Sequence, residues 1–199
     1  MVRITAIYGS PRRGGNSASL LRRAIDGAQE AGAHVEEIVL RDLKISPCLE
    51  IYGCKKDGEC VINDDFQKVR DIMLSSQGII LASPIFFYSV SAHTKILMDR
   101  CQSLWVKKHW VDGIPPGQRV EPKRKGLFIS VGATTGRRLF EGTLLSMRYF
   151  FDVLDAELWR SLTYRGLDLE RDIEGHPEYL AEAYEAGKAL YQIIQTDLK

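Results

Sequence analysis

The sequence predicts a doubly wound α/β domain, in which one parallel sheet carries helices on both faces. Short apolar runs alternate with longer amphipathic runs along the 199 residues of the chain. Residues 78–83 would be apolar on both faces of a strand, which is typical of a strand inside a parallel sheet. Because a parallel crossover is right-handed and needs a helix to return the chain, this alternation places helices on both faces.

The first strand is predicted at residues 2–8. Asn16 or Ser17 supplies an N-cap oxygen for a helix whose apolar residues follow the 3.6-residue period, and Gly32 ends this helix. A second strand follows at residues 34–40.

The middle of the chain repeats this pattern. Asp64 or Asp65 starts the second helix, and the apolar strand at 78–83 follows it. Ser91 caps a third helix, which runs to about Cys101. The fourth strand is predicted at residues 126–132.

The last third of the chain completes a count of five strands and five helices. A helix is predicted at about 140–154, a strand at 157–164 and a final helix at 177–196. The segment 107–125 is irregular and longer than ordinary connections, so it is a candidate lid or subunit arm.

The composition excludes several classes of protein. The chain is 45% hydrophobic and 27% charged, which is typical of a globular protein, and its length predicts one domain over residues 1–199. A net charge of +1 disfavours nucleic-acid binding. We also expect no signal peptide and no membrane span. Three of the 4 cysteines lie within thirteen residues, and a chain of this size does not need a disulfide framework, which favours a reducing cytoplasm.

The loop at residues 9–18 carries groups that bind phosphate. Ligands collect beyond the carboxyl ends of parallel strands, and this loop joins the first strand to the first helix. It offers hydroxyls, an amide, the Arg12 guanidinium and the free N–H groups of a helix N-terminus. The alternative is that Asn16 or Ser17 only caps a helix after a flexible turn.

The same loop lacks the residues of several known phosphate sites. No Gly-Lys-Ser or Gly-Lys-Thr follows its glycines, and the three-glycine dinucleotide fingerprint is absent from it. It also has no acidic pair and no nucleophilic cysteine. The loop is therefore expected to bind a phosphate without attacking it.

Two further loops follow strands at the same edge. In residues 83–91, the consecutive aromatic residues Phe86, Phe87 and Tyr88 suit a flat heterocycle such as an isoalloxazine. The alternative is that Phe86 and Phe87 are core residues and Tyr88 lies at the edge of the core. Residues 132–136 are small or hydroxylated and permit close approach of a ligand.

Three motifs in order resemble the NADPH-dependent FMN reductase and iron-sulfur flavoprotein branch of the flavodoxin-like superfamily. They are Gly9-Ser10-Pro11-Arg12 through Asn16-Ser17, then Ser83-Pro84-Ile85-Phe86, then Lys95-Ile96-Leu97-Met98-Asp99-Arg100. The similarity spans nearly the whole chain up to the last helix. It implies a flavodoxin-like, five-stranded parallel sheet and FMN as the cofactor.

The resemblance also implies the residues that bind FMN. The phosphate would be held by Ser10, Arg12, Asn16, Ser17 and Ala18. The isoalloxazine would lie against Pro84, Ile85, Phe86, Phe87, Tyr88 and Ser89, and against Ala133, Thr134, Thr135 and Gly136.

The function expected from this resemblance is an FMN-dependent oxidoreductase. NADPH or NADH would give hydride to flavin N5, and the electrons would pass to a small acceptor such as a quinone, a flavin, an azo or nitro compound, or a metal ion. The bond changes belong to the cofactor, so no side chain is assigned as catalytic. One alternative is an FMN-binding electron carrier that serves a protein partner, and another is a nicotinamide-binding Rossmann protein. The family resemblance also implies a homodimer or homotetramer.

The cysteines depart from the pattern of the iron-sulfur members. Those members carry Cys-x2-Cys-x2-Cys and a fourth cysteine a few residues later, all as ligands of a [4Fe-4S] cluster. Here Cys48, Cys54 and Cys60 match, but Ile51 stands at the second position. A cluster would need a substitute ligand, for which the candidates are Cys101, Glu50 or a residue of a partner. Otherwise the thiols are free.

Overall fold

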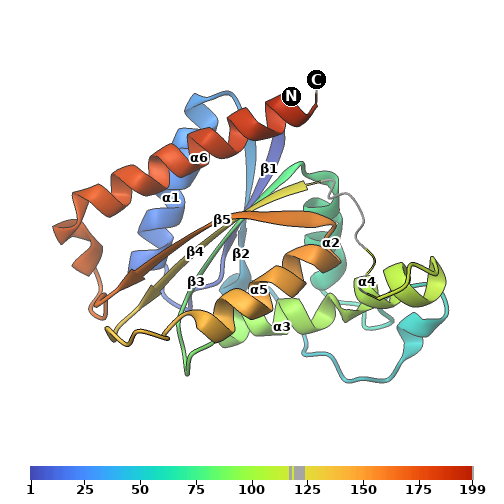
Figure 1. The fold of residues 1–199 in the computed structure, drawn as a ribbon. Coiled ribbons are helices and arrows are strands. Elements are labelled where there is room, and N and C mark those ends of the chain that lie inside the picture. The colour runs from blue at the N-terminus through green and yellow to red at the C-terminus, as the bar shows by residue number, and fades with distance from the viewer. Residues whose placement is uncertain (117, 119–123, 199) are drawn as a thin grey trace.

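The computed structural model describes residues 1–116, 118 and 124–198. In this part of the chain five parallel strands form one sheet in the order β2-β1-β3-β4-β5 (Figure 1). The strands are β1 (Arg3–Tyr8), β2 (His34–Val39), β3 (Gly78–Pro84), β4 (Arg124–Gly132) and β5 (Ala156–Arg165). The doubly wound sheet predicted from the sequence is confirmed.

Six α-helices are present among the described residues, one more than predicted. They are α1 (Asn16–Glu30), α2 (Phe66–Ser75), α3 (Ala92–Arg100), α4 (Gln102–Val106), α5 (Glu141–Val153) and α6 (Pro177–Asp197). The additional helix, α4, follows α3 after a break at Cys101 and continues into a π-helical turn at Lys107–Val111.

The expectation that residues 107–125 are irregular is therefore wrong at its two ends. Residues 107–111 continue the helical path of α4, and β4 already begins at Arg124. Residues 117 and 119–123 of the predicted lid or arm lie outside the described residues.

The sheet separates two apolar layers. Helices α1 and α6 lie together on one face, and α2, α3 and α5 lie on the other (Figure 1). The side chains of β3 alternate between these layers, with Ile80 and Ala82 in the first and Ile79 and Leu81 in the second. This burial on both faces explains why residues 78–83 lack polar alternation. No helix within the described ranges is long and apolar enough to cross a membrane.

Helices α1 and α6 approach each other through glycine. A Cβ atom on Gly187 would collide with the backbone carbonyl of Ala24, and one on Gly27 would collide with the carbonyl of Tyr184. Ala183 and Ala186, both fully buried, continue this small-residue contact along α6. The two helices can therefore cover one face of the sheet at close range.

We predict that Gly187→Ala lowers the free energy of unfolding by about 3 kcal/mol, because a buried backbone carbonyl cannot yield to the new methyl group. The gain in helix propensity, about 1 kcal/mol, is smaller than this cost. Urea denaturation measures the change. The control is Gly175→Ala, where a Cβ atom meets nothing within 4 Å. Equal stability of the two variants would contradict the close approach.

Candidate functional site

A cleft opens at the carboxyl ends of four parallel strands. Residues Ser10, Pro11, Arg12, Gly15, Asn16 and Ser17 line it after β1, and Pro84, Ile85 and Phe86 line it at the end of β3. Val131, Gly132 and Ala133 come from the end of β4, and Leu167 and Asp168 follow β5. The cleft lies where ligands bind in open parallel sheets.

The structure brings eight of the predicted site residues together in this cleft. They are Ser10, Arg12, Asn16, Ser17, Pro84, Ile85, Phe86 and Ala133. The other predicted residues, Ala18, Phe87, Tyr88, Ser89, Thr134, Thr135 and Gly136, do not line it. The sequence did not single out Leu167 and Asp168, although the rule that ligands lie beyond strand ends also applies to the loop after β5.

The N-terminus of α1 faces the cleft without a side-chain cap. Gly15 is the N-cap residue, so the prediction that Asn16 or Ser17 caps this helix is wrong. Both residues already lie in the first helical turn. Among the described residues, the backbone N–H groups of Asn16 and Ser17 have no hydrogen-bond partner. Free N–H groups at the positive end of a helix are suited to an anion.

The Asn16 side chain instead ties two loops together. It is buried, its Nδ2 donates to the carbonyl of Leu169 at 2.9 Å, and its Oδ1 accepts from the N–H of Ile173 at 3.2 Å. Arg12 makes a parallel link, since its Nη1 donates to the carbonyl of Asp168 at 3.2 Å. The loop after β5 is thereby fixed against the loop after β1.

A network of buried hydroxyl groups holds the loops after β1 and β3. The N–H of Ser91 donates to Ser83 Oγ at 3.0 Å, and Ser91 Oγ donates to the carbonyl of Gly9. The same Oγ accepts from the N–H of Thr94 at 3.3 Å, which confirms Ser91 as the cap of α3. A Cβ atom on Gly9 would collide with Thr94 Oγ1, so only glycine fits beside this network.

The aromatic residues after β3 occupy a tight turn. The N–H and carbonyl groups of Phe86 and Ser89 pair with each other at 2.9 Å, and the two central residues have left-handed backbones, with φ of 49° at Phe87 and 60° at Tyr88. Such a turn usually contains Asn or Gly. The ring of Phe86 lines the cleft, whereas Phe87 is 100% exposed. The alternative that Phe86 and Phe87 are core residues is therefore wrong.

Backbone conformations of this kind cost of order 1–3 kcal/mol each in non-glycine residues and persist only where surrounding contacts enforce them. Thr143 of α5 supplies one such contact, because its Oγ1 donates to the carbonyl of Tyr88 at 3.1 Å. The turn holds Phe86 at the cleft and directs Phe87 into solvent.

Positive charge surrounds the β1 side of the cleft. A neighbouring cavity of about 350 Å³ shares Ser10 and Arg12 with the cleft and is also lined by Arg13, Arg22 and Arg41. Its one acidic residue, Glu37, accepts a hydrogen bond from Tyr8 at 2.7 Å. Burial and this hydrogen bond raise the pKa of Tyr8, so Tyr8 is a neutral donor.

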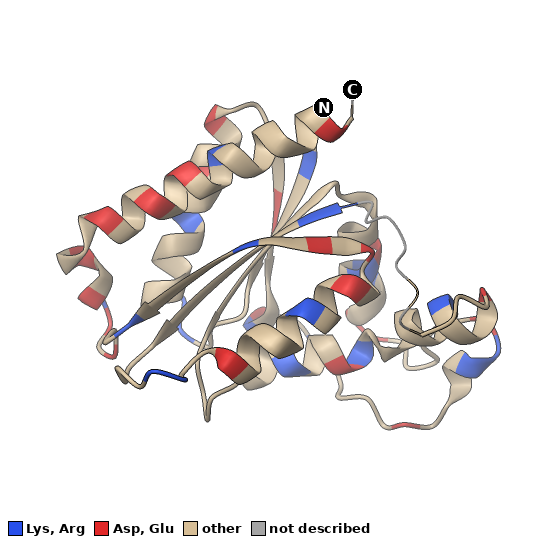
Figure 2. Cartoon of the chain, viewed as in Figure 1, with Lys and Arg blue, Asp and Glu red and all other residues tan. Residues whose placement is uncertain are grey.

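A second basic stretch lies at the other side of the same edge. Figure 2 shows Lys and Arg residues in the loop between β4 and α5, where Arg137 and Arg138 are exposed, and acidic residues along α6. Of these two arginines, Arg138 pairs with Glu141 at 2.7 Å, and Asp168 lines the cleft itself. The excess of positive charge that favours an anionic ligand therefore lies on the β1 side, where Arg12, Arg13, Arg22 and Arg41 gather.

We predict that Asn16→Ala lowers the free energy of unfolding by about 2 kcal/mol, because it leaves the Leu169 carbonyl and the Ile173 N–H without their partner. Urea denaturation of the protein without added ligand measures this change. Ser19→Ala is the matched control in the same helix, since no side-chain hydrogen bond of Ser19 is present among the described residues, and we expect it to stay within about 0.5 kcal/mol of the wild type. If the two variants are equally stable, Asn16 does not join the loops.

Comparison with known proteins identifies a matching family. The family described as NADPH-dependent FMN reductase matches residues 2–142. An iron-sulfur flavoprotein of Methanocaldococcus jannaschii is 41% identical over 103 residues, which make up 52% of this chain and 53% of that protein. The chain spans about half the length of the curated relatives it matches.

Two solved structures share the fold. An NAD(P)H:quinone oxidoreductase from Methanothermobacter marburgensis superposes with a TM-score of 0.71 at 15% identity, over 94% of this chain and 95% of that one. An FMN-dependent NADH-azoreductase from Bacillus anthracis, solved in complex with FMN, superposes with a TM-score of 0.65 at 15% identity, over 96% and 100%. The predicted flavodoxin-like fold is confirmed. Because the family match covers more than half of the chain, the protein belongs to the NADPH-dependent FMN reductase family.

Proposed function

We propose that this protein is an FMN-dependent oxidoreductase that accepts hydride from NADPH or NADH and passes the electrons to a small acceptor. The observation that carries this proposal is the uncapped N-terminus of α1, which opens into a cleft with an apolar far side. Bound FMN supplies the redox chemistry, because its ring accepts a hydride and releases the electrons in a second step. The chain binds and orients the cofactor.

The phosphate end of FMN fits the β1 side of the cleft. Asn16 and Ser17 offer free backbone N–H groups, and Ser10 and Ser17 add hydroxyls. Arg12 is exposed beside them and adds charge-assisted hydrogen bonds to phosphate oxygens. Hydrogen bonds to a charged group contribute about 1.5–3 kcal/mol each, so this end of the cofactor would supply much of the binding free energy.

The ring end fits the apolar side of the cleft. Pro84, Ile85, Phe86 and Ala133 give it a surface without charge. Among the described residues that line the cleft, the ionisable side chains are Arg12 and Asp168, both on the phosphate side or beside it. An apolar ring site suits hydride transfer, which needs close stacking and exclusion of water but no acid or base from the protein.

The acceptor is a small molecule of one of the classes that flavins reduce: a quinone, a free flavin, an azo or nitro compound, or a metal ion. We also propose a homodimer or homotetramer. The fully exposed ring of Phe87 beside the cleft, together with exposed Leu145 and Tyr149 on α5, supports an association that covers this apolar surface.

Anaerobic stopped-flow mixing of the FMN-loaded protein with NADPH, and separately with NADH, tests the activity. We expect the visible absorption band of the bound flavin to disappear after mixing with at least one of the two nicotinamides. The band should return when a quinone is added. An electron carrier would keep its flavin oxidised when mixed with either nicotinamide. A protein that copurifies with dinucleotide and binds no flavin would contradict the proposal.

We predict that Arg12→Ala raises the Kd for FMN by about 10- to 100-fold, because it removes a charge-assisted contact with the phosphate. Quenching of flavin fluorescence during titration measures the Kd. Arg13→Ala is the control, since Arg13 is 70% exposed and pairs with Asp42 at 2.7 Å. We expect less than about a threefold change for this variant. Equal effects of the two substitutions would argue for a diffuse electrostatic field instead of a phosphate contact at Arg12.

A further inference from the structure

A second cavity lies among the cysteines, away from the cleft. The loop between β2 and α2 encloses about 580 Å³ against α3, α4 and the π-helical turn, and Cys48, Cys54 and Cys60 line it. Burial raises the pKa of the Cys54 thiol, and the neighbouring sulfurs of Cys60 and Cys48 raise it further. The three thiols are thus neighbours in one cavity. Iron-sulfur relatives would place a cluster on such residues, so the fit of a cluster can be tested here.

The donor set does not suit a [4Fe-4S] cluster, which needs four ligands. Within residues 1–116, 118 and 124–198, no three Cys, His, Asp or Glu side chains are placed to hold a metal ion. Three thiols line the cavity, so a fourth ligand would have to be a side chain other than cysteine or come from outside the cavity.

Neither substitute ligand within the chain is suitable. Cys101 is 1% exposed, does not line this cavity and packs in the core, so its thiol is not placed to reach a cluster there. The carboxylate of Glu50 lines the cavity but accepts a hydrogen bond from the Tyr52 hydroxyl at 2.6 Å.

Hydrogen bonds from one buried side chain fix the loop between β2 and α2. Arg100 on α3 is buried, and its Nη1 donates to Asp64 Oδ2 at 2.6 Å and to the carbonyl of Ser46 at 2.9 Å. Its Nη2 donates to the carbonyl of Ile62 at 2.9 Å. Burial alone would raise the pKa of Asp64, but hydrogen bonds from Arg100 and from backbone N–H groups outweigh burial and lower it.

Elsewhere in the loop, Lys55 contacts two aromatic residues that line the cavity. Its Nζ lies 3.8 Å from the centre of the Tyr52 ring and 5.0 Å from that of Trp110. A buried guanidinium and a cation–π contact therefore both stabilise this loop.

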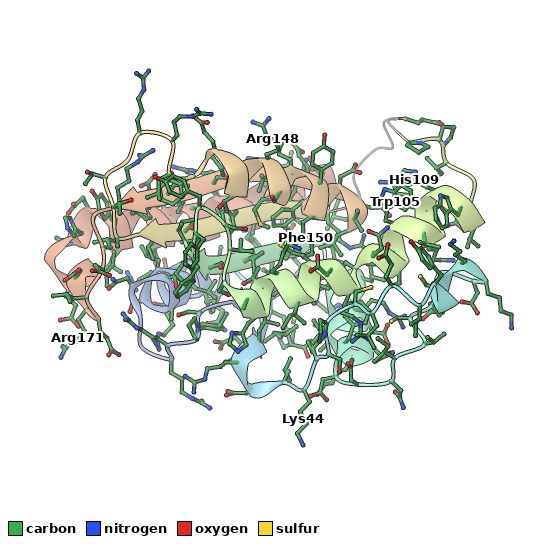
Figure 3. All side chains as sticks on the ribbon, turned by 90° about the horizontal axis from the view of Figure 1, so that it is seen from below. Lys44, Trp105, His109, Arg148, Phe150 and Arg171 are labelled. Atoms are coloured by element: carbon green, nitrogen blue, oxygen red, sulfur yellow. The ribbon has the colours of Figure 1, made fainter. Side chains whose placement is uncertain are left out.

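The cysteine cavity and the cleft lie at opposite ends of the folded molecule. Figure 3 shows Trp105, which lines the cavity, and His109 at one end of the molecule, and Arg171, which follows the cleft residue Asp168, at the other end. Among the described residues, the cavity and the cleft share no lining residue.

We infer that this chain has lost the cluster of its relatives, that Ile51 is the residue responsible, and that its three cavity thiols are free. Ile51 lines the cavity and is 60% exposed, at the position that the four-cysteine spacing reserves for the second ligand. A consequence, which rests on the proposed function, is that electrons pass from the flavin directly to the acceptor.

The experiment compares the wild type with Ile51→Cys after anaerobic reconstitution with ferrous iron and sulfide. The wild type is expected to bind less than about a tenth of an iron per chain, and Ile51→Cys to bind about four iron and four sulfide ions and to turn brown. Because Ile51 is exposed, the substitution should not disturb folding. Two controls isolate the ligand. Ile51→Ser has the size of cysteine without its thiol, and Leu49→Cys places a thiol two residues away on the same cavity wall. Both should stay free of iron.

Thiol titration of the wild type gives an independent readout. Cys48, Cys54 and Cys60 should react with Ellman's reagent in the folded protein, and the buried Cys101 only after unfolding. Stoichiometric iron in the wild type with these thiols protected would overturn the inference, and so would a folded Ile51→Cys variant that binds no cluster. FMN content is measured on the same samples and tests the proposed function separately, because the iron content of the protein does not depend on whether FMN is bound.

Discussion

The shape of the cleft depends on the two hydrogen bonds of one buried amide. The side chain of Asn16, in the first turn of α1, bonds to Leu169 and Ile173 across the sheet edge, and the loop after β5 thereby becomes a wall of the cleft. The first N–H groups of α1 stay free because the N-cap residue is Gly15, which has no side chain to accept from them. Glycine at this position costs only a few tenths of a kcal/mol relative to a polar cap, and the two hydrogen bonds of Asn16 outweigh that cost.

The cleft has a charged side and an apolar side, and each suits a different part of a ligand. Arginines gather on the β1 side, and apolar residues from β3 and β4 form the other side. An elongated ligand with an anionic tail and a flat apolar head matches that asymmetry and has one orientation in it. The chain supplies position and electrostatics, and any bond change must come from the ligand.

Much of the fold could be predicted, because the hydrophobic period and the apolar runs of buried strands are local properties of the sequence. The residues of the candidate site were harder to predict. The loops after β1 and β3 could be found from strand ends, but Phe87 and Tyr88 adopt left-handed backbones that neither residue type signals. Asp168 reaches the cleft through contacts with Arg12 more than a hundred residues away, and α4 is too short for a period to identify it. Long-range contacts decided each of these features.

Helix α3 connects two regions that have been described separately. Ser91, the N-cap of α3, donates to the carbonyl of Gly9 beside the cleft, and Arg100 in the last turn anchors the loop between β2 and α2. Because a helix is stiff along its axis, an axial shift of these nine residues would move both attachment points together.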